Sequence, residues 1–285
     1  MRLTRRGERG YETPVVEIDG TLYDASPVGD FGPDFWASRG PGRLVELAAA
    51  GRLTPLQIHD DVRHGSPVAS TSAVICIGQN YAAHAAESGA SPPQAPIVFL
   101  KTPNTIAGPH DEVTLARGSE KTDWEVELGI VIGSAAVYCD SAQEAAQHIG
   151  GYVLANDLSE RTFQFDDSGG QWSKGKCSPG YMPLGPWIVT AEEFNPDDVA
   201  LRSWVNGEPR QDSRTSDMIF DCAEIVRDLS QYMQLEPGDV ISTGTPEGVA
   251  LSGRFPYLGA GDVVEVEIDG LGRQRQIFQT GEGTR

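Results

Sequence analysis

The stretch EKTDWEVELGIVIG, residues 120–133, predicts a β-strand over Trp124–Ile132 in which polar and apolar side chains alternate. Successive side chains of a strand point to opposite faces, so one face would carry the apolar residues Val126, Leu128 and Ile130. The other face would carry the three acidic residues Asp123, Glu125 and Glu127. We therefore expect a strand with one face in an apolar core and the other in an acidic site.

Carboxylates crowded on one face repel each other, and a hard divalent cation relieves that repulsion. Oxygen-only ligation suits Mg²⁺ or Mn²⁺, with Ca²⁺ as a further candidate, and no cysteine or histidine beside Glu125 and Glu127 favours zinc. Asp157 is a third candidate, because it directly follows the predicted apolar strand Tyr152–Asn156. The spacing alone leaves a plainer alternative open. Acidic pairs with the same spacing occur at Glu17/Asp19 and Glu265/Glu267, where we expect solvated strand faces, and an aspartate at a strand end often serves as a turn residue.

Short apolar stretches separated by turn residues predict that the rest of the chain is rich in strands. Hairpins are expected at Asp19-Gly20, between Val15–Ile18 and Thr21–Tyr23, and at Asp269-Gly270, between Val263–Ile268 and Arg273–Phe278. The other predicted strands are Ala73–Ile77, Ile97–Lys101, Leu201–Val205 and Val240–Thr243. Predicted helices cover Val45–Ala50, Asn80–Ser88, Ser141–Ile149, with Ser141 as N-cap, and Asp221–Met233.

This order of elements predicts a mostly β fold with some α-helix, an α+β fold of the mixed sandwich or roll type. Residues 1–70 combine a hairpin with a polar, irregular segment, and we interpret them as a small N-terminal domain or flap. Residues 71–285 are expected to form one larger domain.

Composition excludes several classes of function. The formal net charge of -19 argues against binding to nucleic acid or to anionic membranes. No apolar run approaches the roughly 18 residues of a membrane helix, and the N-terminus lacks the apolar part of a signal peptide, so we expect a cytoplasmic protein. The four cysteines form no CxxC pair, which argues against a zinc knuckle and a disulfide framework. Cys177 is either a reactive thiol or, as we favour, a packed structural residue.

The segment NYAAHAAE, residues 80–87, places His84 and Glu87 three positions apart, so that they are neighbours on a helical turn. A carboxylate beside an imidazole fixes its tautomer and raises its basicity, as a water-activating base requires. The alternative is an ordinary ion pair on the surface of a helix.

Together with these residues, a series of motifs in consistent order resembles the fumarylacetoacetate hydrolase superfamily. The segment RGSEKTDWEVELG is most similar to its branch of acylpyruvase-like and diketo-deoxy-sugar-acid hydrolases. The resemblance covers about residues 72–280 and rests on CIGQNYAAHAAE (76–87), EKTDWEVELGIVIG (120–133), GYVLANDLSER (151–161), QWSKGK (171–176), PLGP (183–186), VNGEPRQ (205–211) and PGDVISTGTPEGV (237–249).

The resemblance implies a mixed β-sandwich roll with a small N-terminal domain, and a homodimer. It implies that Mg²⁺ or Mn²⁺ is held by Glu125, Glu127 and Asp157. It also implies three catalytic residues, which are the dyad His84 and Glu87 and the active-site lysine Lys176. The residues that match substrate-binding positions of the family are Arg161, Gln164 and Thr245.

Two departures from the family pattern flank the expected pocket. Glu160 stands where alanine is more usual, and CSPGY at 177–181 replaces a more usual Ser-x-Asp-x-Phe. The additional acidic ligand of true fumarylacetoacetase has no counterpart in this sequence, which disfavours that activity.

The predicted function is metal-dependent hydrolysis of a carbon–carbon bond in a small 2,4-diketo acid, giving pyruvate and a second acid. The substrate would be an acylpyruvate or a 2,4-diketo-3-deoxy sugar acid. The alternatives are an oxaloacetate decarboxylase and an isomerase or hydratase of 2-oxo-alkene-dioates, because these reactions also pass through an enolate of the 2-oxo acid. A binding protein with a purely structural metal would need none of His84, Glu87 and Lys176.

Overall fold

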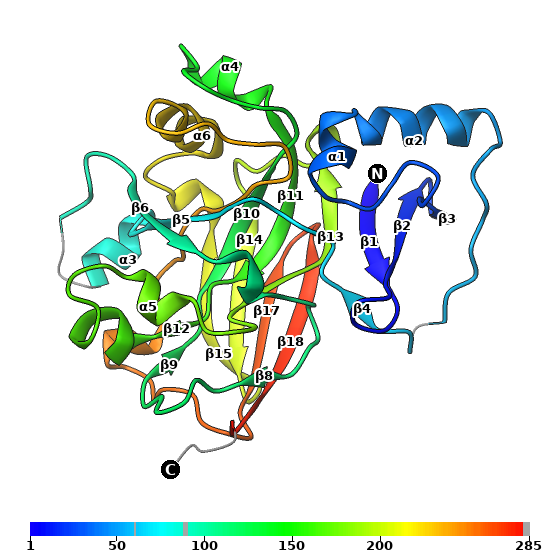
Figure 1. Ribbon diagram of the computed structural model, residues 1–285. Helices are drawn as coiled ribbons and strands as arrows, with labels where there is room; N and C mark the ends of the chain where they lie inside the picture. The colour runs from blue at the N-terminus through cyan, green and yellow to red at the C-terminus, as the bar shows by residue number, and fades with distance from the viewer. Residues whose placement is uncertain (60, 88–90, 282–285) are drawn as a thin grey trace.

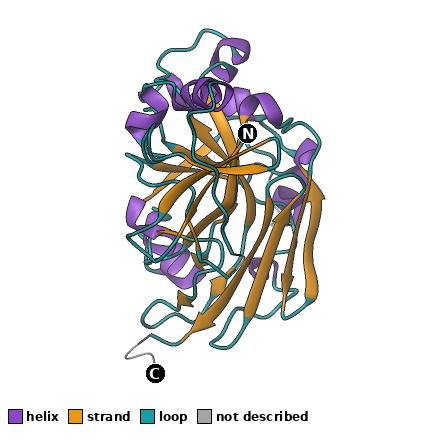
Figure 2. Ribbon diagram, turned by 90° about the vertical axis from the view of Figure 1, so that its right-hand side faces the viewer, coloured by secondary structure: helices purple, strands orange, loops and turns teal. Residues whose placement is uncertain are grey.

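The computed structural model describes residues 1–59, 61–87 and 91–281. It shows a body of β-strands with the N-terminal strands set to one side (Figure 1). Most helices lie on the outside of the strands when the molecule is turned by 90° (Figure 2). Within the described residues, no helix is long and apolar enough to cross a membrane.

The largest sheet has the strand order β3-β2-β1-β13-β11-β10-β16-β5-β6, with β4 added beside β1 and β7 beside β13. Its central strand β10 pairs with β11 on one side and β16 on the other, both antiparallel. The strands are β1 (Arg2–Arg6), β2 (Thr13–Ile18), β3 (Thr21–Asp24), β4 (His64–Gly65), β5 (Val74–Gly78), β6 (Ile97–Lys101), β7 (Ile106–Ala107), β10 (Val126–Ile132), β11 (Ile149–Asn156), β13 (Met182–Thr190) and β16 (Val240–Ser242).

A second, five-stranded sheet with the order β15-β14-β17-β18-β8 packs against the first. A third sheet consists of two short strands, β9 (Thr122–Asp123) and β12 (Ser159–Glu160), beside the site described below. The strands of the second sheet are β8 (Val113–Thr114), β14 (Ala200–Val205), β15 (Glu208–Arg214), β17 (Val263–Ile268) and β18 (Gly272–Gln279).

Strand β10 is buried on both faces because it separates two apolar clusters. Leu128 and Ile130 belong to the cluster that includes residues of the second sheet, such as Val264. Val131 belongs to the cluster on the other face, which includes Phe35 of the N-terminal part of the chain. The acidic face predicted for this strand is therefore confined to its beginning.

Short helices connect the strands. Ser141 caps α4 as predicted, because its side chain accepts a hydrogen bond from the backbone of Glu144. Asp221 caps α6 in the same way through Glu224. The α-helices are α1 (Pro33–Ala37), α2 (Gly40–Ala49), α3 (Ala82–Glu87), α4 (Ala142–Ala146), α5 (Ser173–Lys176) and α6 (Cys222–Ser230). The π-helix η2 (Thr162–Asp166) and the 3₁₀ turns η1 (Pro103–Thr105), η3 (Ala191–Glu193), η4 (Thr215–Asp217) and η5 (Ala250–Ser252) complete the set.

The predicted mixed, mostly β fold and both hairpins are confirmed. Helix α2 begins at Gly40 instead of the predicted Val45, and α3 begins at Ala82 instead of the predicted Asn80. The predicted end of α3, Ser88, lies outside the described residues. Strands β1, β13 and β15 were not predicted. The nine-residue strand β13 was not predicted because it contains Pro183, Gly185 and Pro186, and proline and glycine are uncommon in strands. The division at residue 70 stays a prediction, although β1 joins the N-terminal strands to the large sheet by pairing with β13.

Candidate active site

Glu125, Glu127 and Asp157 come together in the structure. One carboxylate oxygen from each lies within 4.8 Å of the other two, and all three residues are buried. Glu127 lies in β10, Glu125 just before it, and Asp157 just after β11. Because β10 and β11 run antiparallel, with Val126 opposite Asn156, the start of one strand meets the end of the other. A backbone hydrogen bond of 2.9 Å from Asp157 N to Glu125 O fixes that meeting point.

Asp123 does not share this site, and the prediction of three carboxylates on one strand face is wrong. The regular strand begins only at Val126, and Asp123 lies in β9. Its side chain accepts hydrogen bonds from the backbone of Ala250 (2.8 Å) and Leu251 (2.9 Å) and from Arg161 Nε (2.9 Å). The carboxylate of Asp123 therefore supports Arg161 instead of facing the other acids.

Each carboxylate of the cluster has its own partners. Glu127 Oε2 accepts from Ser242 Oγ at 2.5 Å and from Gly244 N at 2.9 Å. Glu125 accepts from Arg161 Nη2 at 2.6 Å and from Lys176 Nζ at 2.5 Å. These contacts fix the orientation of the oxygens, as the outer shell of a metal site requires.

Asp157 lies between two lysines that come from different parts of the chain. Lys101 Nζ contacts Asp157 Oδ1 at 2.5 Å, and Lys176 Nζ contacts Asp157 Oδ2 at 2.9 Å. Lys101 also donates to the backbone oxygens of Leu158 (3.0 Å) and Tyr181 (2.8 Å). Lys101 therefore occupies one oxygen of Asp157 and directs the other toward Glu125 and Lys176.

The electrostatics of the cluster fit a hard cation. Burial raises the pKa of Glu127 well above its usual range, and the charges of Asp157 and Glu125 raise it further. Burial also acts to raise the pKa of Glu125, but Arg161 and Lys176 outweigh it and hold this pKa at about 2. After burial, the second cause of the raised pKa of Glu127 is repulsion among carboxylates, which a divalent cation would relieve. The donors are all oxygens, so these three residues would suit Mg²⁺ or Mn²⁺.

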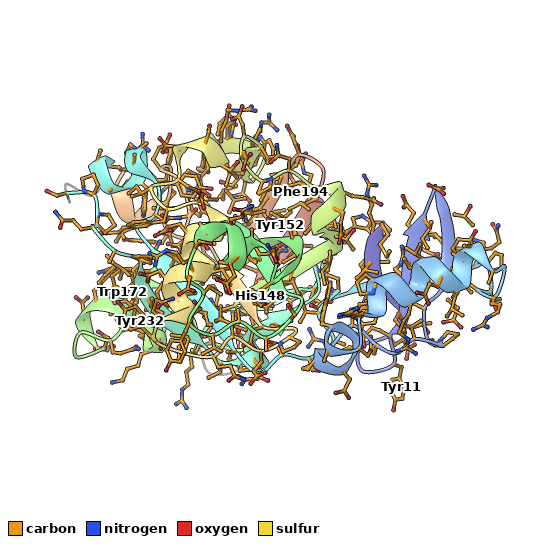
Figure 3. The ribbon with its side chains drawn as sticks, turned by 90° about the horizontal axis from the view of Figure 1, so that it is seen from above. Tyr11, His148, Tyr152, Trp172, Phe194 and Tyr232 are labelled. Atoms are coloured by element: carbon orange, nitrogen blue, oxygen red, sulfur yellow. The ribbon has the colours of Figure 1, made fainter. Side chains whose placement is uncertain are left out.

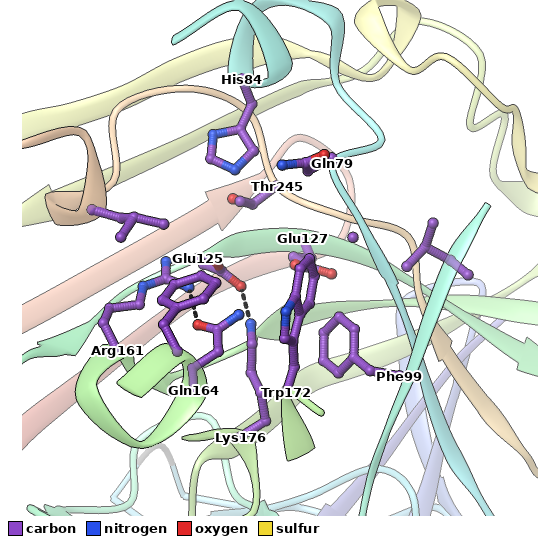
Figure 4. A pocket seen from close by; sticks show the side chains of 14 residues that line it. Gln79, His84, Phe99, Glu125, Glu127, Arg161, Gln164, Trp172, Lys176 and Thr245 are labelled. Carbon is purple, nitrogen blue, oxygen red and sulfur yellow. Dashed lines mark hydrogen bonds and ion pairs between the residues drawn. The ribbon is translucent and has the colours of Figure 1, made fainter. Parts of the chain in front are cut away.

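His84 and Glu87 lie on α3, where His84 faces the acidic cluster from above (Figure 4). His84 Nδ1 lies 3.6 Å from Glu87 Oε2 and has no hydrogen-bond partner within the described residues. Glu87 also accepts from Gly248 N at 3.2 Å and forms an ion pair with Arg254. Burial lowers the pKa of His84, and this outweighs the opposing effects of Glu125 and Glu87. A neutral imidazole can accept a proton.

The three residues predicted to bind substrate line the same cavity as Glu125, Glu127, His84 and Lys176. This cavity has a volume of about 70 Å³. Arg161 donates from Nη1 to Gln164 Oε1 at 2.8 Å. The hydroxyl of Thr245 donates to Val126 O at 2.9 Å and accepts from Gln211 Nε2 at 2.8 Å. Neutral and cationic groups thus surround the acids in a pocket that suits a small anionic ligand.

Several residues that line the cavity were not predicted from the sequence; among them are Gln79, Phe99, Phe165, Trp172 and Leu251. Trp172 contacts both phenylalanines, with ring centroids 5.5 Å from Phe99 and 6.1 Å from Phe165. Trp172 lies at the end of the molecule opposite Tyr11 of the N-terminal region (Figure 3). These aromatic residues come from β6, η2 and the loop before α5, and no periodic pattern in the sequence links them.

The two departures from the family pattern have different settings. Glu160 is buried and accepts hydrogen bonds from the backbone of Lys121 (2.7 Å) and Phe163 (2.7 Å), so it joins β9 to η2. Cys177 is half-buried, and its thiol donates to Leu100 O at 3.6 Å. These contacts fit the structural role favoured for Cys177.

Comparison with known proteins agrees with the fold. Residues 73–279 match the sequence profile of the family described as "Fumarylacetoacetate (FAA) hydrolase C-terminal". The chain belongs to this family. It is therefore an enzyme, and its mixed fold is of the fumarylacetoacetate hydrolase type, as predicted.

Relatives with full-length similarity include hydrolases and an isomerase. A 2,4-didehydro-3-deoxy-L-rhamnonate hydrolase of Sphingomonas sp. (strain SKA58) is 41% identical over 97% of this chain and 95% of that protein. The structure of 5-carboxymethyl-2-hydroxymuconate delta-isomerase from Mycobacterium smegmatis has a TM-score of 0.77 and 36% identity, covering 99% of both chains. Maleylpyruvate hydrolase from Sphingobium sp. SYK-6, in complex with manganese (II) ion and pyruvate, has a TM-score of 0.78 and 26% identity, covering 99% of this chain and 100% of that one.

Proposed function

We propose that this enzyme hydrolyses a carbon–carbon bond in a small 2,4-diketo acid and releases pyruvate and a second carboxylic acid. The observation that carries the proposal is one cavity in which Glu125 and Glu127 lie below His84 and beside Lys176. Asp157 completes the acidic cluster and contacts Lys176. The hydrolase activity in the name of the Sphingomonas relative supports it. The candidate substrates are acylpyruvates and 2,4-diketo-3-deoxy sugar acids.

Glu125, Glu127 and Asp157 would hold Mg²⁺ or Mn²⁺, and the manganese ion of the maleylpyruvate hydrolase structure supports such a site. When bound, a divalent cation supplies a Lewis acid for the 2-oxo acid end of the substrate. Arg161 and Lys176 add positive charge beside Glu125, at 2.6 Å and 2.5 Å. The anionic end of the substrate therefore has a defined place among these residues.

His84 would act as the general base. Its neutral ring takes a proton from a water molecule, and the oxygen of that water forms a bond to the C4 carbonyl carbon of the substrate. The bond between C3 and C4 then breaks, and its electron pair stays on C3. The proton that His84 took from water is then transferred to C3, which completes pyruvate and restores the neutral imidazole, and the acyl group leaves as a carboxylic acid. Glu87 would hold the imidazole and stabilise its protonated form.

Lys176 would stabilise the negative charge that develops on the C4 oxygen. Its side chain is almost completely buried, and two of its contacts are Glu125 Oε2 and Asp157 Oδ2. An ammonium group has three protons, so it can keep both contacts and donate to an oxyanion in the cavity. These charges also raise its pKa, which keeps Lys176 protonated at neutral pH.

The test is a substrate panel with acetylpyruvate, a 2,4-diketo-3-deoxy sugar acid and oxaloacetate, run with Mg²⁺ and with a chelator. The proposal predicts chelator-sensitive release of pyruvate and an acid from one or both diketo acids. Release of carbon dioxide from oxaloacetate alone would instead support a decarboxylase. The homodimer and the cytoplasmic location expected from the sequence stay predictions, and light scattering would test the first.

A further inference from the structure

We propose that Gln79 is a specificity-determining residue that binds a hydroxyl group on the acyl part of the substrate. The enzyme would then prefer a 2,4-diketo acid with a hydroxylated acyl chain, such as a 2,4-diketo-3-deoxy sugar acid, over a simple acylpyruvate. This inference rests on the proposed hydrolase function and concerns the choice between its two substrate classes.

The backbone at Gln79 is held in an unfavourable conformation. Its φ is 53°, in the left-handed region that residues with a side chain rarely adopt. The next residue enforces it, because the side chain of Asn80 donates to Phe220 O (3.0 Å) and Thr243 O (2.8 Å) and accepts from Phe220 N (2.9 Å). Such strain persists only where the surroundings fix it, and it often marks a functional position.

The consequence of this conformation is that the amide of Gln79 enters the cavity. Gln79 lies next to His84 and Thr245 in the wall above the acidic cluster (Figure 4). The preceding residue, Gly78, passes so close to Trp172 that a Cβ atom there would lie 2.5 Å from the indole ring. The end of β5 therefore brings Gln79 and Trp172 to the same part of the cavity.

Gln79 differs from Gln164 and Thr245, the other amide and hydroxyl side chains that line the cavity. Gln164 Oε1 is engaged by Arg161, and the hydroxyl of Thr245 both donates and accepts within the protein. Within the described residues, no hydrogen bond engages the side chain of Gln79. A primary amide can donate to and accept from a hydroxyl group, whereas it lacks the charge that would favour a carboxylate.

The aromatic wall supports the same class of ligand. Trp172 and Phe99 line the cavity with ring centroids 5.5 Å apart, and they offer apolar surface to the carbon atoms of a chain. An acyl chain with hydroxyl groups has both C–H surface for this wall and a hydroxyl for Gln79. A pocket built to hydrogen-bond a hydroxyl discriminates against an analogue that lacks it.

The experiment compares kcat/KM for a 2,4-diketo-3-deoxy sugar acid and for acetylpyruvate in wild type, Gln79→Leu and Gln79→Gly. We expect wild type to prefer the sugar acid, and both variants to reduce that preference about tenfold by lowering activity on the sugar acid alone. Gln79→Gly also removes the backbone strain, so it keeps the test valid if Gln79→Leu folds poorly. Gln147→Leu, at an exposed position after α4, is the control for the same exchange.

Two results would overturn the inference while leaving the hydrolase function intact. One is a wild-type preference for acetylpyruvate, and the other is a preference that stays within twofold of wild type in both variants. Failure of wild type to hydrolyse either substrate would instead refute the proposed function, and the inference with it.

Discussion

Replacing Arg254 with glutamine tests whether the dyad of His84 and Glu87 is held in place from outside the helix. Arg254 follows η5 and forms an ion pair with Glu87 Oε1, whereas Glu87 Oε2 faces His84 Nδ1 at 3.6 Å. Arg254→Gln removes the charge that holds one carboxylate oxygen. Among the described residues, Glu87 would then keep the hydrogen bond from Gly248 N, which at 3.2 Å is long, and the neighbouring ring of His84.

Two limits set the size of the effect. The side chain of Arg254 is 55% exposed, so the ion pair would contribute at most about 1 kcal/mol to the free energy of unfolding. Complete loss of a general base lowers turnover by roughly 10²–10⁴-fold, which is the upper limit for a change that only misplaces it. We therefore expect Arg254→Gln to lower kcat about tenfold, with KM within twofold and almost unchanged stability.

The assay is steady-state hydrolysis of a 2,4-diketo acid at saturating Mg²⁺, together with thermal unfolding of each variant. Arg227→Gln is the matched control, because Arg227 forms a comparable ion pair with Glu224 on α6. Glu87→Gln should lower kcat at least as much, and the double variant should show less than the sum of the two effects. An unchanged kcat in Arg254→Gln, or a fall shared by Arg227→Gln, would refute this reasoning.

Three further predictions concern pH and buried charges. Because the neutral form of His84 is the active one and burial lowers its pKa, kcat/KM should rise with pH through a midpoint below 6.5. A midpoint above 6.5 would contradict this assignment, as would a midpoint that is unchanged in His84→Ala. Lys101→Met should lower the free energy of unfolding by about 3 kcal/mol in denaturant titrations, since it leaves Asp157 Oδ1 and two backbone oxygens without a donor while Lys176 still contacts Asp157 Oδ2; a loss below about 1 kcal/mol would contradict this. Burial acts to raise the pKa of Asp111, but hydrogen bonds from Arg63 and other donors hold it at about 2 instead of 3.8. Asp111→Asn should therefore lower the free energy of unfolding by about 2 kcal/mol at neutral pH, and this difference from wild type should disappear as the pH falls from 3.8 toward 2.

The cluster of Glu125, Glu127 and Asp157 could be predicted from local patterns together with the family resemblance, because spacing alone left solvated strand faces as an alternative. Glu127 lies near the start of a strand, and Asp157 directly follows the strand that pairs with it. The error over Asp123 has a local cause. Its carboxylate accepts a hydrogen bond from the backbone of Trp124 at 2.9 Å, so the chain departs from the regular strand in which alternation would apply.

The remainder of the site could not be predicted because it depends on contacts between distant segments. Lys101 reaches Asp157 across the fold, from a position 56 residues earlier in the sequence. The aromatic wall joins Phe99 to Trp172, which are 73 positions apart in the sequence and meet only when β6 packs beside α5. The conformation of Gln79 is set by the hydrogen bonds of Asn80 to Phe220 and Thr243.

The proposed function depends on one divalent cation held by the three buried carboxylates Glu125, Glu127 and Asp157. Isothermal titration calorimetry with Mn²⁺ on the wild-type protein, Glu127→Gln and Glu267→Gln tests this binding. Glu267→Gln is the control, because Glu267 lies on the partly exposed face of β17. We predict one site per chain in wild type and in Glu267→Gln, and loss of that site in Glu127→Gln. Binding of Mn²⁺ to Glu127→Gln with unchanged affinity would contradict the claim.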